Sequence, residues 1–132
     1  MGKNLKAIRS LGIDVIMEGV CDLTLEGRKF SGNALRCRRE WMLYHGTMIC
    51  DFDIGLISNC LGKPKREPEY RKARSHEAFL TKLPVSTSAL SEALASAWGA
   101  TENFELSNEV RELSDQLAHE KYETTDWLRK IV

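Results

Sequence analysis

The stretch DLTLEGRKFSGNALR, residues 22–36, holds two strand-like runs on either side of Glu26-Gly27. Apolar and polar residues alternate in both runs, which favours extended structure, and the Glu-Gly pair suits a tight turn between paired strands. In this pattern Lys29 and Ser31 would point to one face of the second strand, and Arg28 and Phe30 to the other. The stretch therefore predicts part of a β-meander.

Further strands flank this hairpin. One run precedes it at residues 15–17, and another follows at residues 41–50, after the charged residues 38–40. Since so short a link cannot cross over to a parallel neighbour, we expect antiparallel pairing. A short helix over residues 5–11, ended by Gly12, should come before the strands.

From residue 53 onward the apolar spacing becomes helical. The expected helices cover residues 53–61, 86 or 88 to 98, and 107–122, with a last turn at residues 124–127. One helix, about four strands and then three or four helices predict an α+β fold, an antiparallel sheet backed by helices. A chain of 132 residues is one domain's worth at most, so we expect a single domain over residues 1–132.

Composition excludes several classes of protein. The 19 basic residues balance 19 acidic ones, so no overall field attracts nucleic acid or a membrane surface. No apolar run is long enough to span a bilayer, and the start has no signal-peptide pattern, so the cytoplasm is the expected compartment. The four cysteines form no CxxC pair and should be free; Cys37, Cys50 and Cys60 are expected as buried apolar fillers.

Residues 63–74 are the most basic part of the chain. They hold six basic residues, two acidic ones and two prolines, which predicts an exposed loop with a local charge of +4. Such a loop could close over a bound intermediate or meet an acidic partner.

The chemistry-bearing residues gather in the opening stretch. Lys29, Asn33 and neighbouring arginines offer donors to a phosphate or carboxylate, and Asp22 is a candidate magnesium ligand. Gly32 would let a ligand or another backbone approach the strand closely. The alternative is a solvent-facing edge strand whose charges oppose aggregation. For His45, in an apolar strand, a hydrogen-bonded core position is the alternative to a functional one.

Two linked motifs resemble those of a known family. GRKFSGNA at residues 27–34, followed by YHGT at 44–47, resembles the lysine motif and His-Gly-Thr strand of lipoate-protein ligases, whose fold is shared with biotin-protein ligases and class II synthetases. The likeness continues through residues 51–53, the PEYR motif at 68–71 and the end of the chain. It implies that ATP and lipoate, or octanoate, form an acyl-adenylate. A lysine of a lipoyl acceptor domain, in a 2-oxoacid dehydrogenase or a glycine cleavage protein, then takes the acyl group.

The resemblance also implies residue roles. Lys29 matches the central lysine, which stabilises charge on carboxylate and phosphate oxygens. Asp22 matches a position near magnesium and the adenylate. The remaining matches are to a loop around the nucleotide phosphate, at Ser31, Gly32, Asn33 and Arg36, and to the strand beneath it, at His45, Gly46 and Thr47.

The sequence departs from the family pattern in two ways. The arginine-rich, triple-glycine segment expected to line the acyl pocket belongs well upstream of Lys29, and only 28 residues precede that lysine. Activity is therefore expected only with a missing N-terminal half or a second copy. Cys21 also stands where asparagine is common; related octanoyltransferases use a cysteine nucleophile, but eight residues before Lys29 is closer than expected. A non-catalytic interaction module and an octanoyltransferase are the alternatives.

Overall fold

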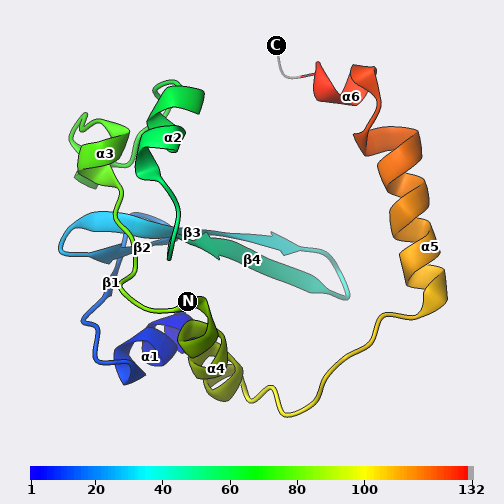
Figure 1. Cartoon of the computed structure of the whole chain (residues 1–132), viewed down its shortest axis with the longest axis horizontal. Coiled ribbons are helices and arrows are strands. Elements are labelled where there is room, and N and C mark those ends of the chain that lie inside the picture. The colour runs from blue at the N-terminus through cyan, green and yellow to red at the C-terminus, as the bar shows by residue number, and fades with distance from the viewer. Residues whose placement is uncertain (131–132) are drawn as a thin grey trace. The chain divides into compact units, whose positions relative to one another are not determined.

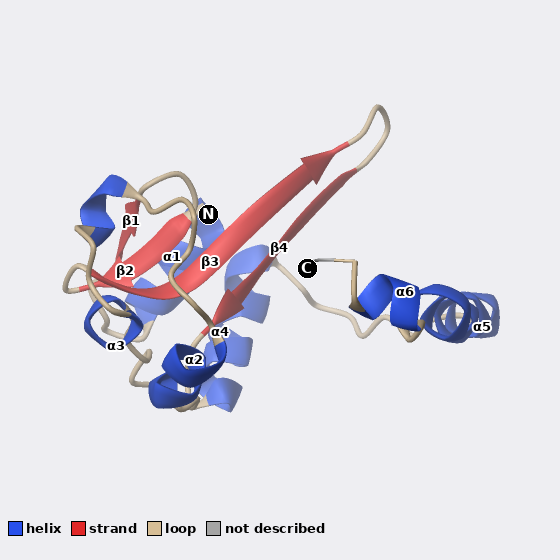
Figure 2. Ribbon diagram, turned by 90° about the horizontal axis from the view of Figure 1, so that it is seen from above, coloured by secondary structure: helices blue, strands red, loops and turns tan. Residues whose placement is uncertain are grey.

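The computed structural model describes residues 1–130 and divides into two compact units, Met1–Thr101 and Glu102–Val132. In the first unit a four-stranded antiparallel meander follows one helix (Figures 1 and 2). The elements are α1 (Gly2–Ser10), β1 (Ile16–Glu18), β2 (Asp22–Leu25), β3 (Arg28–Cys37) and β4 (Met42–Met48). The predicted helix, strands and antiparallel pairing are confirmed.

The turn between β2 and β3 forms at the predicted pair. Glu26 and Gly27 both have positive φ, 51° and 69°, which matches the twist of two paired strands. Only Gly27 adopts such an angle without steric cost from a side chain.

Helices lie on both sides of the sheet, with α1 and α4 on one side and α2 and α3 on the other (Figure 1). The helices after the sheet are α2 (Ile54–Cys60), the 3-10 turn η1 (Glu69–Arg71), α3 (His76–Phe79) and α4 (Thr87–Trp98). Asp53, Ser75 and Ser86 cap α2, α3 and α4, each accepting a hydrogen bond from a backbone N–H of the first turn. The α+β fold and the predicted helices of this unit are confirmed.

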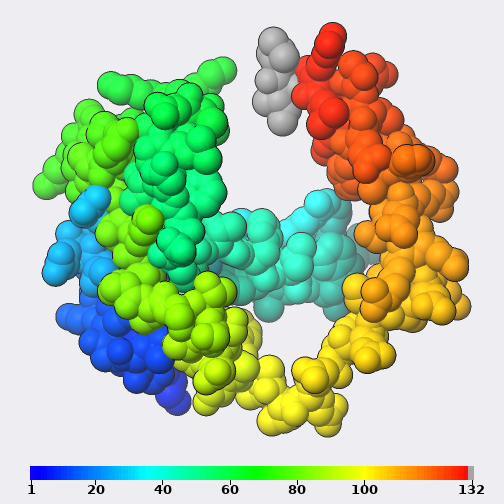
Figure 3. All heavy atoms as spheres, viewed as in Figure 1, coloured from blue at the N-terminus to red at the C-terminus, as the bar shows by residue number. Residues whose placement is uncertain are grey.

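The core of the first unit lies between the sheet and α1 and α4. Its buried side chains are Ile8, Val15, Leu23, Phe30, Leu83 and Leu90. Burial of one such side chain contributes about 1.5–3 kcal/mol. The outer parts of β3 and β4 extend beyond these helices, as the cyan and teal spheres of Figure 3 show.

The second unit is helical. It contains α5 (Asn108–Leu117), a π-helical turn η2 (Ala118–Tyr122) and α6 (Thr125–Leu128). Ser107 caps α5 as the sequence predicts, and Thr124 caps α6. The Lys121 ammonium lies 5.1 Å from the ring centres of both Tyr122 and Trp127. Within residues 1–130 no helix combines the length and apolar character that crossing a bilayer requires.

Two of the cysteines differ from expectation. All four are free as predicted, but Cys37 and Cys60 are exposed and Cys50 is half-buried. Cys37 ends β3 on the outer part of the hairpin, and Cys60 ends α2, so neither is covered by a second layer. Burial of these thiols was wrongly predicted, because the general tendency of free cysteine to be buried does not hold at these uncovered ends.

Candidate functional site

A β-bulge in β3 decides which side chains share a face. Leu23 pairs with Ser31 and the next residue, Thr24, pairs with Lys29, so Phe30 is an extra residue. Directly paired residues share a face, and neighbours along a strand alternate. Lys29 and Ser31 therefore point to opposite faces, and the prediction that they share one is wrong, because one inserted residue reverses the alternation.

The bulge brings Lys29 to Asp22. The ammonium lies 2.7 Å from Asp22 Oδ1, and the side chain is about one quarter exposed. It arches over Gly32, where an added Cβ would lie 3.1 Å from Lys29 Nζ. The group that approaches Gly32 closely in the structure is thus the Lys29 side chain, where the sequence predicted a ligand or another backbone.

Tyr70 completes this cluster from the other side of the carboxylate. Its hydroxyl donates to Asp22 Oδ2 at 2.7 Å, so both oxygens of Asp22 are engaged. Burial, and then the hydrogen bond to Asp22, raise the pKa of Tyr70 far above its ordinary value of 10.0. Tyr70 stays a donor throughout the physiological range. The PEYR motif carried this residue, but nothing in the sequence pointed to Asp22 as its partner.

An open strip of sheet surface leads away from the cluster. Gly32, Ala34 and Arg36 alternate along β3 on the face of Asp22, because Asp22 pairs with Gly32. Their partners on β4 are Thr47, His45 and Leu43. Ala34 and the side chains beyond it are exposed. The strip combines a floor of small residues with cationic and polar groups around it, an arrangement that admits an anionic ligand.

For His45 the structure excludes the core alternative, and for residues 31–36 it confirms the predicted strand over the loop that the family resemblance implied. His45 is exposed rather than a hydrogen-bonded core residue. Residues 31–36 belong to strand β3 rather than to a loop, because they pair with β4 along their whole length.

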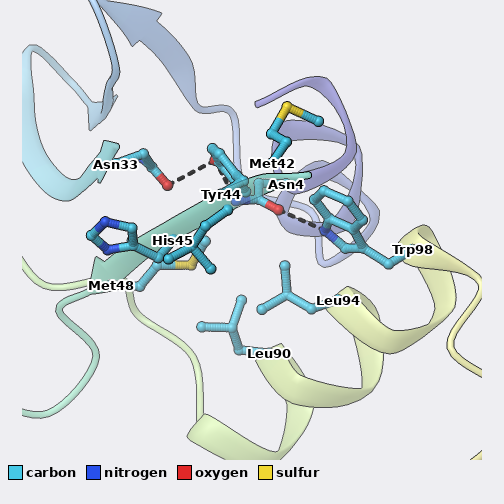
Figure 4. Close-up of a pocket in the computed structure, with 11 residues that line it drawn as sticks. Asn4, Asn33, Met42, Tyr44, His45, Met48, Leu90, Leu94 and Trp98 are labelled. Atoms are coloured by element: carbon cyan, nitrogen blue, oxygen red, sulfur yellow. Dashed lines mark hydrogen bonds between the residues drawn. The ribbon is translucent and has the colours of Figure 1, made fainter. Parts of the chain in front are cut away.

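The opposite face of β3 is closed by hydrogen bonds. Asn33 donates to the Cys21 carbonyl at 3.0 Å and to Ser31 Oγ at 3.1 Å, and accepts from the Tyr44 hydroxyl at 2.8 Å. Asn4 extends this hydrogen-bond network, because it donates to the Tyr44 hydroxyl and accepts from the Trp98 indole N–H (Figure 4).

Gly46 makes this network possible, because an added Cβ there would collide with the Asn33 carboxamide. Ser31 and Asn33 therefore lie on the far side of the strand from Lys29, and their polar groups are used within the sheet.

The basic segment at residues 63–74 is not an exposed loop throughout. Arg71 is 4% exposed and lies over the Phe79 ring, with Glu67 at 3.5 Å. Arg74 donates to the carbonyls of Gly27 and Tyr70 at 3.0 and 2.8 Å. Composition overstated the exposure because two of its arginines are used to fasten the turn.

Asp22 by itself does not form a magnesium site. Both of its oxygens already contact Lys29 and Tyr70. Residues 1–130 hold no group of three His, Cys, Asp or Glu placed to bind a metal. Magnesium binding by Asp22 therefore stays a prediction.

One hollow of the first unit lies apart from the Lys29 cluster. It encloses about 790 Å³ and is lined mainly by apolar residues of β4 and α4. A second hollow of about 580 Å³ places Cys21 beside Met1, Leu35 and Trp98. Neither hollow includes Asp22, Lys29 or Tyr70. Cys21 thus lines the Asn33 face, not the Lys29 face.

Comparison with curated proteins gives relatives of two activities. An octanoyltransferase LipM from Carboxydothermus hydrogenoformans is 33% identical over 119 residues, covering 81% of this chain and 44% of the relative. A probable lipoate-protein ligase A from Mycoplasma pneumoniae is 27% identical over 131 residues, covering 93% and 39%. The chain thus spans less than half the length of these relatives.

Solved structures share the fold. The bi-partite lipoate protein ligase of Thermoplasma acidophilum, studied with its E2 lipoyl domain, has a TM-score of 0.78 at 20% identity, over 95% of this chain and 53% of that one. A lipoate-protein ligase A bound with ATP has the same TM-score at 19% identity, over 95% and 54%.

The family model for the lipoyl protein ligase A/B catalytic domain matches residues 4–96. That match covers the sheet, the Lys29 cluster and α1 to most of α4. The chain therefore belongs to the lipoyl protein ligase A/B catalytic-domain family and represents a C-terminal part of that domain.

Proposed function

We propose that this chain forms the adenylate-facing part of a lipoate-protein ligase, which activates lipoate or octanoate with ATP and passes the acyl group to a lysine of a lipoyl acceptor domain. One observation carries the proposal: the Lys29 ammonium is held by Asp22 at the head of an open sheet strip with a small-residue floor. The ATP-bound ligase of the same fold supports it.

The Lys29 ammonium would stabilise negative charge in both steps of the reaction. In the first, a carboxylate oxygen of the acid attacks the α-phosphorus of ATP and pyrophosphate leaves. In the second, the acceptor amine attacks the acyl carbonyl and AMP leaves, with one proton lost from the amine. Negative charge builds on phosphate or carbonyl oxygens each time, and a fixed cation stabilises it.

The strip has the length for a nucleotide. Gly32 and Arg36 are four strand residues apart, so their Cα atoms lie about 13 Å from each other. With the phosphate beside Lys29, the rest of the ligand would lie across Ala34 toward Arg36. Within residues 1–130 the Arg36 guanidinium has no hydrogen-bond or ion-pair partner, and it is exposed to meet a ligand.

The Asn33 face supports the need for a companion half. Leu35 and Met42 are 55% and 66% exposed there, and Trp98 is 45% exposed. An apolar surface of this kind is typical of a face that another chain segment covers. We propose that an N-terminal half, of the kind that makes the relatives more than twice as long, covers it and supplies the acyl pocket.

Mass spectrometry of acyl-adenylate would test the proposal. The chain is mixed with lipoate, ATP and the separately expressed N-terminal half of the Mycoplasma pneumoniae ligase. We expect adenylate only when both parts are present. Sedimentation of the chain alone shows whether a second copy covers the apolar face instead. Absence of adenylate from a complex that forms would contradict the ligase proposal and favour a non-catalytic interaction module.

Octanoyl transfer without ATP is the second candidate, favoured by the 33% identical octanoyltransferase. Through Cys21 it would form a thioester that Cys21→Ser abolishes. The placement of Cys21 on the face opposite Lys29 weighs against this route. Transfer from an octanoylated carrier in the absence of ATP would decide for it.

A further inference from the structure

We propose that Tyr70 is a positioning residue for Lys29, acting through Asp22. This inference rests on the proposed function for its consequence, but its geometry stands by itself. The Tyr70 hydroxyl and the Lys29 ammonium each lie 2.7 Å from a different oxygen of the same carboxylate. Asp22 is 8% exposed, so its carboxylate depends on these two donors more than on water.

The turn that carries Tyr70 is fastened to the β2–β3 hairpin. Arg74 joins the Gly27 carbonyl of the hairpin turn to the Tyr70 carbonyl with one nitrogen. Arg71 and Arg74 also exchange hydrogen bonds, each from its Nε to the other's carbonyl, at 3.1 and 3.0 Å. The backbone of Tyr70 is thus tied to the strands that bear Asp22 and Lys29.

The Tyr70 ring is held as firmly as its backbone. Phe79 lies against it with ring centres 5.2 Å apart, and Gly19 lies on another side. A Cβ added at Gly19 would be 3.3 Å from Tyr70 Cε1. The ring therefore has little freedom to swing its hydroxyl away from Asp22.

The consequence for Lys29 follows from the carboxylate's two oxygens. A donor fixed on Oδ2 sets the plane of the carboxylate, so Oδ1 faces the ammonium in one orientation. When an incoming phosphate draws the ammonium away, Asp22 keeps one donor. A nearly buried carboxylate left with none would carry a large desolvation cost. Tyr70 thus aligns the Lys29 ammonium and keeps Asp22 hydrogen-bonded while the ammonium contacts a ligand.

The test measures Lys29 directly, without relying on activity. The chain is treated briefly with acetic anhydride, and mass spectrometry gives the acetylation rate of Lys29 divided by that of the exposed Lys6 on α1. Tyr70→Phe keeps the ring and removes only the hydroxyl. We expect the ratio to rise about two- to fivefold, because the ion pair loses its alignment, and to rise further in Asp22→Asn. Tyr122→Phe, in the second unit, is the matched control and should leave the ratio unchanged.

Each outcome bears on the inference. An unchanged ratio in Tyr70→Phe beside a raised ratio in Asp22→Asn would overturn it, and so would no change in either. If Tyr70→Phe unfolds, Lys6 and Lys29 become equally reactive; Arg74→Gln then replaces it, since it loosens the turn but keeps the hydroxyl, and an unchanged ratio there counts against the inference. Failure of ATP and lipoate to protect Lys29 in the assembled wild-type complex would instead count against the proposed function.

Discussion

The two faces of β3 carry residues that are neighbours in the sequence but have different surroundings. On one face Lys29, Gly32 and Arg36 border an open strip. On the other, Ser31 and Asn33 are buried, and their polar groups are bonded to each other and to Tyr44 and the Cys21 carbonyl. A motif interpreted from the sequence as one site thus divides into a surface open to a ligand and a hydrogen-bond network that holds this surface in place.

The two glycines of the region make the same contrast. A Cβ at Gly32 would lie 3.1 Å from the flexible end of Lys29 and in ordinary contact, at 3.8 Å, with Asp22 Oδ1. At Gly46 it would meet the fixed Asn33 carboxamide and, at 2.9 Å, the backbone oxygen of Gly32. Gly32 keeps room for a mobile functional group, whereas Gly46 keeps room for a structural one.

The largest effect is expected on the open face. Lys29→Ala should lower the rate of adenylate formation in the assembled complex by about 10²–10³-fold, since it removes a fixed charge opposite the reacting oxygens. Lys82→Ala, which removes an exposed lysine 3.8 Å from Asp51, is the matched control and should change little. The measurement is single-turnover mass spectrometry. Equal rates for the two variants would contradict the role of Lys29.

On the closed face the main effect should be on stability. Asn33→Ala removes three hydrogen bonds at a buried position and should lower the free energy of unfolding by about 2–4 kcal/mol. Asn59→Ala, at an exposed position of α2, should stay within about 0.5 kcal/mol. Urea unfolding followed by circular dichroism measures both. An unchanged stability with lost ATP binding would show that Asn33 contacts the ligand after all.

Substitutions of the two glycines should distinguish the faces by their separate effects on stability and on rate. Gly46→Ala should destabilise the chain by about 1–3 kcal/mol, because the Asn33 network must move. Gly32→Ala should change stability by less than about 1 kcal/mol, yet slow adenylate formation about tenfold by shifting the ammonium. Gly62→Ala, with open space around the added carbon, is the control. A larger loss of stability in Gly32→Ala and a larger loss of rate in Gly46→Ala would contradict the different roles of the two faces.

The smallest effect concerns alkaline pH. Burial and the Asp22 hydrogen bond raise the pKa of Tyr70 above the ordinary 10.0, so above that pH the unfolded chain has lost a proton that the folded chain keeps. The free energy of unfolding should then fall as pH rises through about 10 to 11, and Tyr70 contributes no slope below that range. Tyr70→Phe should make the slope of the unfolding free energy against pH less steep, by an amount that corresponds to at most one proton per molecule. Unfolding midpoints measured across that range would show it; identical slopes in both proteins would contradict the raised pKa.

Much of the fold could be predicted because its signals are local. The Glu26-Gly27 turn, the caps at Ser86 and Ser107, and the apolar spacing of α4 each depend on residues a few positions apart. The faces of β3 could not be predicted, since the bulge at Phe30 depends on pairing with β2. Tyr70 was missed as a site residue because its partner, Asp22, is 48 residues away.

The elements, their order, the antiparallel pairing and the motifs that carry the family likeness follow from the residues alone, because they rest on short-range propensity and on residue types at fixed spacing. Which of the motif's side chains meet depends on the folded sheet. Side-chain direction in a sheet depends on register, and a single extra residue in one strand reverses it. That is why Lys29 reaches Asp22 and Tyr70 while Ser31, two positions later, points to the other side.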